Sequence, residues 1–169
     1  EDSPLLTIEK ALSIINPDEF SPVTIHLSVG AFAPSTTGED FPIIMISNVN
    51  LIGGGQEVTI LNAEGSGVNP RRVINMENCE NNTISDITIT GGLIAQEEGE
   101  MYSSPYGGGM YLSHSNPVLA HLTIIENETY YTGGGIYINH SNPTLTDVTI
   151  IDNRAVYQGG GIKLYKSNP

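Results

Sequence analysis

The sequence predicts an all-β fold, a parallel β-helix solenoid of about five coils with a short N-terminal capping helix. Three observations lead to this prediction: a triple internal repeat, short runs in which apolar and polar residues alternate, and a composition rich in turn formers. The 169 residues include 19 Gly and 10 Pro, too many for a helical bundle, while 38% hydrophobic residues is too apolar for a disordered chain. A turn-rich β protein is the class that remains.

The internal repeat has a constant period of 26 residues. A Gly-Gly-Gly triplet followed by an apolar residue begins at Gly107, Gly133 and Gly159, and each triplet is followed by a Ser-Asn-Pro motif, the first at Ser115. Helical repeats need longer amphipathic runs with a 3.6-residue period, which this chain lacks. Short alternating runs such as residues 119–124 predict strands instead. Repeated strand–turn units of this length wind most simply into a parallel β-helix.

The chain is expected to form a single domain over residues 1–169, in three parts. Residues 1–20 form an N-terminal cap, because apolar residues recur at helical spacing over 6–15 after Thr7, a suitable N-cap residue. Such a helix covers the open end of the first coil. Residues 21–106 form irregular coils, and residues 107–169 form the 26-residue repeats with the last coil truncated.

One coil is expected to carry an insertion. Residues 74–89 resemble the later coils at an offset of 35 rather than 26, which leaves about nine extra residues, placed in the acidic segment 96–105. Glu97, Glu98 and Glu100 of this segment offer carboxylates for Ca²⁺, but Ca²⁺ loops usually carry Asp, Asn or Gly at alternate positions. A solvated acidic loop is the favoured interpretation.

Charge and cysteine content exclude several kinds of partner. Six Lys+Arg against 19 Asp+Glu give a net charge of −13, which disfavours nucleic acid and anionic membrane surfaces because both are bound by clustered Lys and Arg. The apolar runs are strand-sized, so no membrane insertion by this segment is expected. Cys79 is the single cysteine, which excludes an intramolecular disulfide framework and predicts a small core residue.

With these features the chain resembles the right-handed parallel β-helix, pectin-lyase-like superfamily. The runs TIEKAL, VTIHLSVGAF and NVNLIGGGQEVTIL look like the usual opening of that family, a capping helix followed by the first coils. The GGG[I/M] repeats with Ile124-x-x-Asn127 and Ile150-x-x-Asn153 are similar to those of polymorphic outer-membrane and other secreted surface proteins. In those proteins the repeat is a GGA-type turn paired with an aromatic-x-x-Asn motif. In this chain Ile takes the place of the aromatic residue. The resemblance implies a right-handed coil, and the fold hosts lyases, hydrolases, adhesins and structural rods.

Candidate catalytic groups are sparse. A polysaccharide lyase of this superfamily needs a Lys or Arg base, and Arg71-Arg72 is the only basic cluster, for which solvated charges at the rim are the favoured interpretation. A glycoside hydrolase needs two carboxylates, and Glu126 and Asp152 stack one period apart, with both expected at exposed turns. Catalytic residues are therefore not assigned, and whether the chain is an enzyme stays open.

Two tyrosine columns are the candidate ligand contacts. Tyr111 and Tyr137 lie one period apart, as do Tyr131 and Tyr157. Aromatic ladders on a flat β face bind sugar rings by stacking, which makes these four residues candidates for glycan stacking. The same ladders also stabilise coil-on-coil pairing without any ligand. Both roles remain open.

Other columns are expected to be structural. His114 and His140 stack with Lys166 continuing the column, but no third ligand follows, so no metal and no cofactor are predicted. Asn116 and Asn142 form one expected Asn ladder.

Three sequons make Asn81, Asn127 and Asn139 candidate N-glycosylation sites. Asn127 also pairs with Asn153 in a second expected Asn ladder, which competes with a sugar on its amide.

Two functions fit these residues. The first is a non-catalytic structural scaffold located extracellularly or at the cell surface: a surface rod, an adhesin segment or a filament subunit. The chain lacks an initiator Met and stops in mid-repeat, so both ends are expected to be cuts, or residues 1–6 of a second copy complete the last coil by end-to-end strand addition. The alternative is a carbohydrate-binding module or a polysaccharide lyase or hydrolase. The expected partners are therefore a second copy or surface glycans.

Overall fold

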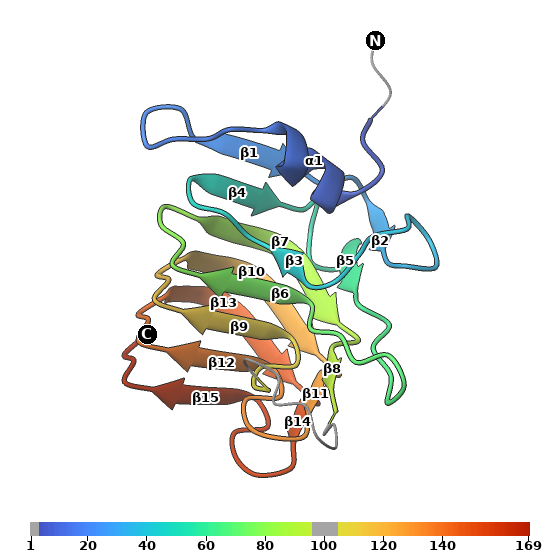
Figure 1. The fold of residues 1–169 in the computed structure, drawn as a ribbon, viewed down its shortest axis with the longest axis vertical. Helices are drawn as coiled ribbons and strands as arrows, with labels where there is room; N and C mark the ends of the chain where they lie inside the picture. The colour runs from blue at the N-terminus through green and yellow to red at the C-terminus, as the bar shows by residue number, and fades with distance from the viewer. Residues whose placement is uncertain (1–3, 96–104) are drawn as a thin grey trace.

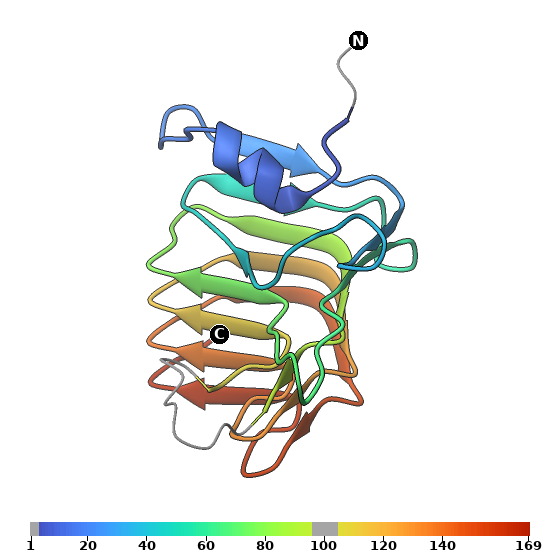
Figure 2. The same cartoon turned by 45° about the vertical axis from the view of Figure 1, so that its right-hand side comes forward.

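The computed structural model describes residues 4–95 and 105–169 and shows a parallel β-helix (Figure 1). Two of its sheets hold five parallel strands each along the stack, so the chain makes five coils, as the sequence predicts. The strands of successive coils lie one below the other as the rungs of flat faces (Figure 2). No helix among the described residues is long and apolar enough to cross a membrane.

Three sheets form the sides of the coils. The first holds β1 (Val23–His26), β4 (Val49–Ile52), β7 (Thr83–Thr90), β10 (Val118–Ile125) and β13 (Thr144–Ile151), with β2 (Gly30–Phe32) and β5 (Thr59–Asn62) beside this path. The second holds β3 (Ile43–Ile44), β6 (Ile74–Glu77), β9 (Met110–Ser113), β12 (Ile136–Asn139) and β15 (Ile162–Tyr165). The third holds β8 (Leu93–Ile94), β11 (Glu128–Thr129) and β14 (Arg154–Ala155).

The strand register reproduces the sequence repeat. Ile136 of β12 pairs with Met110 of β9 on one side and with Ile162 of β15 on the other, a step of one repeat each time. Leu119 of β10 pairs with Ile84 of β7, which confirms the longer offset of 35. The expected insertion lies almost entirely outside the described residues, including the three candidate Ca²⁺ ligands.

The core is a column of apolar side chains inside the coils. Alternate residues of each strand point inward, so equivalent positions stack from coil to coil. The large side chains that are almost fully buried include Leu51, Leu61, Ile74, Met76, Ile84, Ile87, Ile89, Met110, Leu112, Leu119 and Leu122. Cys79 is buried against this column, as predicted. In the last coil the inward residues, such as Val148 and Ile150, are only half-buried.

The predicted capping helix is present as α1 (Ile8–Ile14), which lies across the N-terminal end of the stack (Figure 1). Thr7 is its N-cap, and the Oγ1 atom of Thr7 accepts a hydrogen bond of 3.2 Å from the backbone N–H of Lys10. The buried Glu39 carboxylate accepts further bonds from the backbone N–H groups of Ile8 and Glu9, at 2.6 and 3.0 Å. Two backbone N–H groups in the first turn of α1 thereby find their hydrogen-bond acceptor in the loop before β3.

The glycine triplets allow the backbones of neighbouring coils to approach closely. A Cβ atom on Gly134 would lie 2.3 Å from the carbonyl oxygen of Arg154 and 2.5 Å from that of Gly160. Backbone oxygens at such positions cannot swing aside as a flexible side chain would. The triplet is therefore required by packing between coils.

Replacing Gly134 by alanine is expected to lower the free energy of unfolding by about 3 kcal/mol, because the coils must separate to admit the methyl group. The matched control is Gly160→Ala in the last coil, where the nearest atom to the new Cβ is the Asn153 oxygen at 2.9 Å. Urea denaturation followed by circular dichroism measures both. Equal losses for the two variants would contradict the packing explanation.

Candidate functional site

The first tyrosine column lies on the outer face of the second sheet. Tyr111 of β9 and Tyr137 of β12 are paired in register, and their rings are parallel with centroids 5.8 Å apart. Tyr106 adds a third ring, stacked on Tyr137 with centroids 4.6 Å apart, and the guanidinium carbon of Arg72 lies 4.8 Å from the Tyr111 centroid. The column is therefore a continuous stack of Arg72 and three tyrosines.

The burial of this stack limits what it can bind. Only 7% of Tyr111 and 9% of Tyr137 are exposed, because the rings pack on one another and on their neighbours. Desolvation also raises the pKa of the Tyr137 hydroxyl, and the nearby Tyr106 and Tyr111 hydroxyls add to the shift. A sugar ring has no open aromatic face here, which corrects the glycan-stacking prediction for these two residues. Their stacking instead joins β9 to β12.

Arg72 is a buried structural residue, so the prediction of a solvated charge is wrong for it. The side chain is 8% exposed. Its Nε and Nη2 atoms donate to the carbonyl oxygens of Gly107 and Tyr106, at 2.9 and 2.6 Å, and its Nη1 atom donates to Asn75 Oδ1 at 2.8 Å. Burial lowers the pKa of Arg72 to about 10. The guanidinium thus holds the backbone at the start of the first glycine triplet.

The second tyrosine column lies in the turns that follow β11 and β14. The centroids of Tyr131 and Tyr157 are 5.9 Å apart with the rings tilted by 34°. Tyr130 packs edge-on against both rings, and a hydrogen bond with Tyr157 raises the pKa of the Tyr130 hydroxyl. Tyr157 is 61% exposed, so this column keeps an open aromatic surface.

The two columns meet in one tyrosine cluster. Tyr106 lies edge-on against Tyr131 at 6.1 Å between centroids, which links the buried stack to the exposed turns. The cluster comprises Tyr106, Tyr111, Tyr130, Tyr131, Tyr137 and Tyr157. The sequence repeat did not reveal Tyr106 or Tyr130, because no tyrosine stands one period away from either.

Histidines occupy two further columns. The rings of His114 and His140 stack at 4.9 Å, and desolvation followed by the charge of Lys166 lowers the pKa of His140. His121, which has no evident partner in the sequence, lies between two carboxylates: Nδ1 is 3.5 Å from Asp86 and Nε2 is 3.5 Å from Asp147. Over the described residues, no group of three or more His, Cys, Asp or Glu side chains could hold a metal ion.

The two pairs of candidate catalytic residues have different surroundings. Glu126 and Asp152 are exposed at equivalent turns, as predicted, and both have positive φ angles, of 54° and 52°. The Nη1 atom of Arg71 donates to the carbonyl oxygen of Ala63 at 3.5 Å, whereas the guanidinium of Arg72 bonds to the carbonyl oxygens of Gly107 and Tyr106. The two adjacent arginines therefore do not form a cationic patch.

The three sequons differ in accessibility. Asn127 is 1% exposed, and its Nδ2 atom donates to the carbonyl oxygens of Ile89 and Ile125, each at 3.0 Å. A sugar on that nitrogen would replace one of the two N–H hydrogens that make these bonds and would have to fit in a buried position, which corrects the prediction of Asn127 as an acceptor and makes it a ladder residue. Asn81 is exposed and Asn139 is half-buried.

One protein-family model matches almost the whole chain. The model of a family described as "Protein of unknown function (DUF1565)" matches residues 1–168. The chain belongs to this family. No curated protein and no solved structure matches the chain. This DUF1565 member is a parallel β-helix by its stacked parallel sheets and their strand registers.

Proposed function

We propose that this DUF1565 chain is a non-catalytic structural scaffold of an extracellular or cell-surface protein, as a surface rod, an adhesin segment or a filament subunit. The observation that carries the proposal is that the repeated side chains bond to their equivalents in the next coil. A catalytic or binding site would instead direct such side chains at a ligand.

The Ser-Asn-Pro turns show this pattern twice over. The backbone N–H of Ser115 donates to Ser141 Oγ at 3.0 Å, and the N–H of Ser141 donates to Ser167 Oγ at 3.1 Å. In the neighbouring column the N–H of Asn142 donates to Asn116 Oδ1 at 2.6 Å. The regular spacing of these residues along the chain is thus explained by cohesion of the stack.

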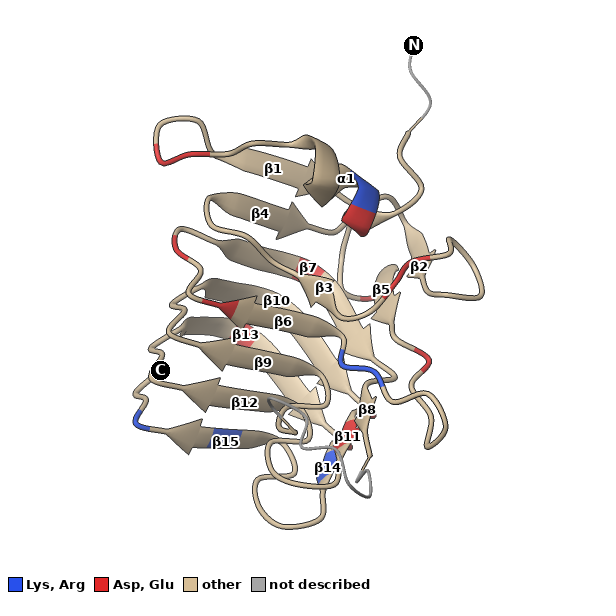
Figure 3. Ribbon diagram, in the orientation of Figure 1, with Lys and Arg blue, Asp and Glu red and all other residues tan. Residues whose placement is uncertain are grey.

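The charge distribution supports a solvated surface. Figure 3 shows the acidic residues spread over turns and several strands, with Lys and Arg few and scattered. Net charge far from zero keeps a rod soluble, and it disfavours nucleic acid as a partner. The resemblance of the glycine repeats to secreted surface proteins favours the extracellular location.

In the filament version, copies associate end to end by strand addition. β13, β14 and β15 are the last strands of their sheets and leave one edge unpaired among the described residues. Such an edge accepts a further strand, from residues 1–6 of a second copy or from another chain.

Electron microscopy of the native material, with mass spectrometry of the same sample, tests the proposal. Filaments or extended rods that contain this chain support a scaffold. Compact particles that depolymerise an acidic polysaccharide would overturn it, because such activity requires a catalytic site.

A carbohydrate-binding module is the second candidate, favoured by the exposed Tyr157 ring on the tyrosine cluster. On this hypothesis Tyr157→Ala abolishes glycan binding on an array, since the stacking of a sugar ring needs an open aromatic face. The expected change in unfolding free energy is under about 1 kcal/mol, because the ring is largely solvated. Tyr165→Ala, which removes a ring that is 47% exposed outside the cluster, is the matched control. Equal binding by parent and Tyr157→Ala contradicts this candidate.

A further inference from the structure

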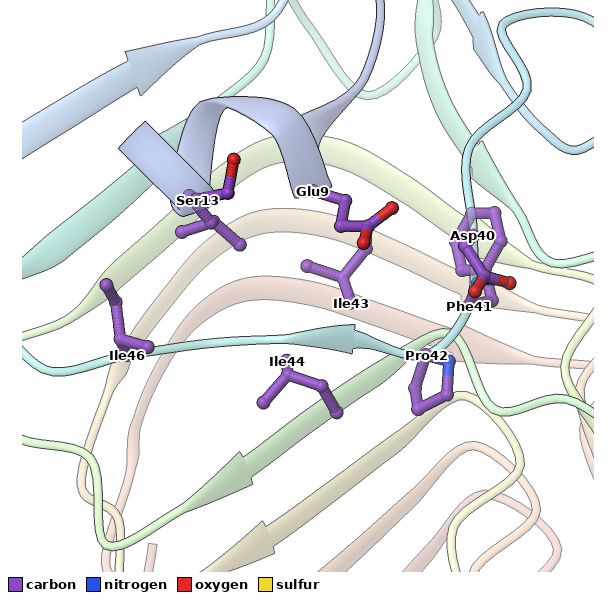
Figure 4. Close-up of a pocket in the computed structure, with 9 residues that line it drawn as sticks. Glu9, Ser13, Asp40, Phe41, Pro42, Ile43, Ile44 and Ile46 are labelled. Atoms are coloured by element: carbon purple, nitrogen blue, oxygen red, sulfur yellow. Dashed lines mark hydrogen bonds between the residues drawn. The ribbon is translucent and has the colours of Figure 1, made fainter. Parts of the chain in front are cut away.

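An apolar groove of about 520 Å³ lies between α1 and β3 (Figure 4). Its apolar wall is formed by Leu12, Phe41, Pro42, Ile43, Ile44 and Ile46. Glu9 of α1 and Asp40 of the loop before β3 contribute two carboxylates to the lining. The groove lies at the capped end of the stack, remote from the tyrosine cluster.

β3 borders the groove with an unpaired edge. β3 is the end strand of its sheet and, among the described strands, pairs only with β6. The N–H groups of Ile43 and Met45 donate to Val73 and Asn75, at 2.9 and 3.0 Å. Because successive residues of a strand direct their backbone groups to opposite sides, the N–H and C=O of Ile44 point away from β6. A donor and an acceptor are thereby left for a further strand.

The charges beside the groove specify what that strand should carry. Glu9 and Asp40 are both exposed, and neither forms an ion pair with a described residue. Their negative charges act on the buried Glu39, whose pKa is raised first by desolvation and then by these two neighbours. A cation placed between Glu9 and Asp40 would relieve this repulsion, whereas an anionic ligand would increase it.

We propose that this groove binds an extended segment of another protein, which adds to β3 as a parallel or antiparallel strand and places a Lys or Arg beside Glu9 and Asp40. The backbone groups of Ile44 supply main-chain bonding, the isoleucine-lined wall receives alternate apolar side chains, and the carboxylates select a basic residue. This inference goes beyond the scaffold function and does not depend on it, because the groove is complete within one chain.

The test uses the whole chain and a fluorescein-labelled hexapeptide of sequence Thr-Val-Lys-Val-Thr-Val with blocked ends. Fluorescence anisotropy is expected to show saturable binding. Glu9→Gln and Asp40→Asn should each weaken binding about two- to fivefold, the range for one exposed ion pair. Ile44→Lys should abolish it, because a cation at the edge of the groove repels the peptide and occupies the apolar wall.

Matched controls separate the groove from general effects. Glu57→Gln removes an exposed carboxylate elsewhere, and Val58→Lys adds a cation at a residue that is 41% exposed outside the groove. Both should bind the peptide like the parent. The proposal is overturned if a peptide with Glu in place of Lys binds equally well, if Ile44→Lys binds like Val58→Lys, or if no binding occurs up to about 1 mM.

Discussion

Replacing Asn127 by alanine is expected to lower the free energy of unfolding by about 4 kcal/mol. Asn127 Oδ1 accepts from the backbone N–H of Gly92 at 2.9 Å, and its Nδ2 atom donates to the carbonyl oxygens of Ile89 and Ile125. Alanine leaves three backbone groups without their Asn127 partner, those of Gly92 and Ile89 in buried positions and that of Ile125 in a half-buried one, each at a cost of about 1–3 kcal/mol. Urea denaturation monitored by circular dichroism gives the difference.

Asn153→Ala provides the matched control in the last coil. Asn153 Nδ2 donates to the carbonyl oxygens of Ile124 and Ile151, at 2.7 and 2.9 Å, but the side chain is only half-buried. Water can replace part of these bonds, so we expect a loss of about 1–2 kcal/mol. If the two substitutions cost the same, burial is not what makes the Asn127 contacts important.

Ile136→Asp is expected to prevent stable folding. Ile136 is fully buried and lies between Met110 and Ile162 of the adjacent coils. An unpaired carboxylate there costs several kcal/mol, which we put at about 5 kcal/mol, comparable with the whole stability of a small domain. Thermal unfolding and the fraction of soluble, folded protein are the measurements.

The same substitution in the last coil should be milder. Ile150 is half-buried, so Ile150→Asp keeps access to water and should lose about 2 kcal/mol. Ile136→Val, which keeps the site apolar, should cost about 1 kcal/mol. If Ile136→Asp melts like the parent, the inward register of β12 is wrong.

The sequence predicted those contacts that follow from periodicity. In a parallel β-helix, residues one period apart lie on adjacent rungs, so the repeat spacing led directly to the stacking of Tyr111 on Tyr137 and of His114 on His140. It also led to the Asn127–Asn153 ladder, in which the two amides bond at 3.0 Å. Local pattern was sufficient here because each coil repeats its neighbour.

Contacts at interruptions of the repeat were not predictable in this way. The sequence predicts a solvated charge at Arg72, because no arginine or lysine stands one period away to mark it as part of a stacked column. Tyr106 and Tyr130 have no periodic counterparts. The groove beside β3 depends on how α1 settles against one strand, which no local pattern encodes.

The register of the last three coils has a consequence for how such molecules change in evolution. Because Met110, Ile136 and Ile162 occupy one column at an unvarying step, deleting or duplicating one repeat unit keeps the strand register and the apolar column on either side of the join. Each added unit would lengthen the molecule by about 4.8 Å, the spacing between paired strands. Recombination between repeats can therefore adjust reach in small, fixed increments while the two ends, and whatever they engage, stay unaltered.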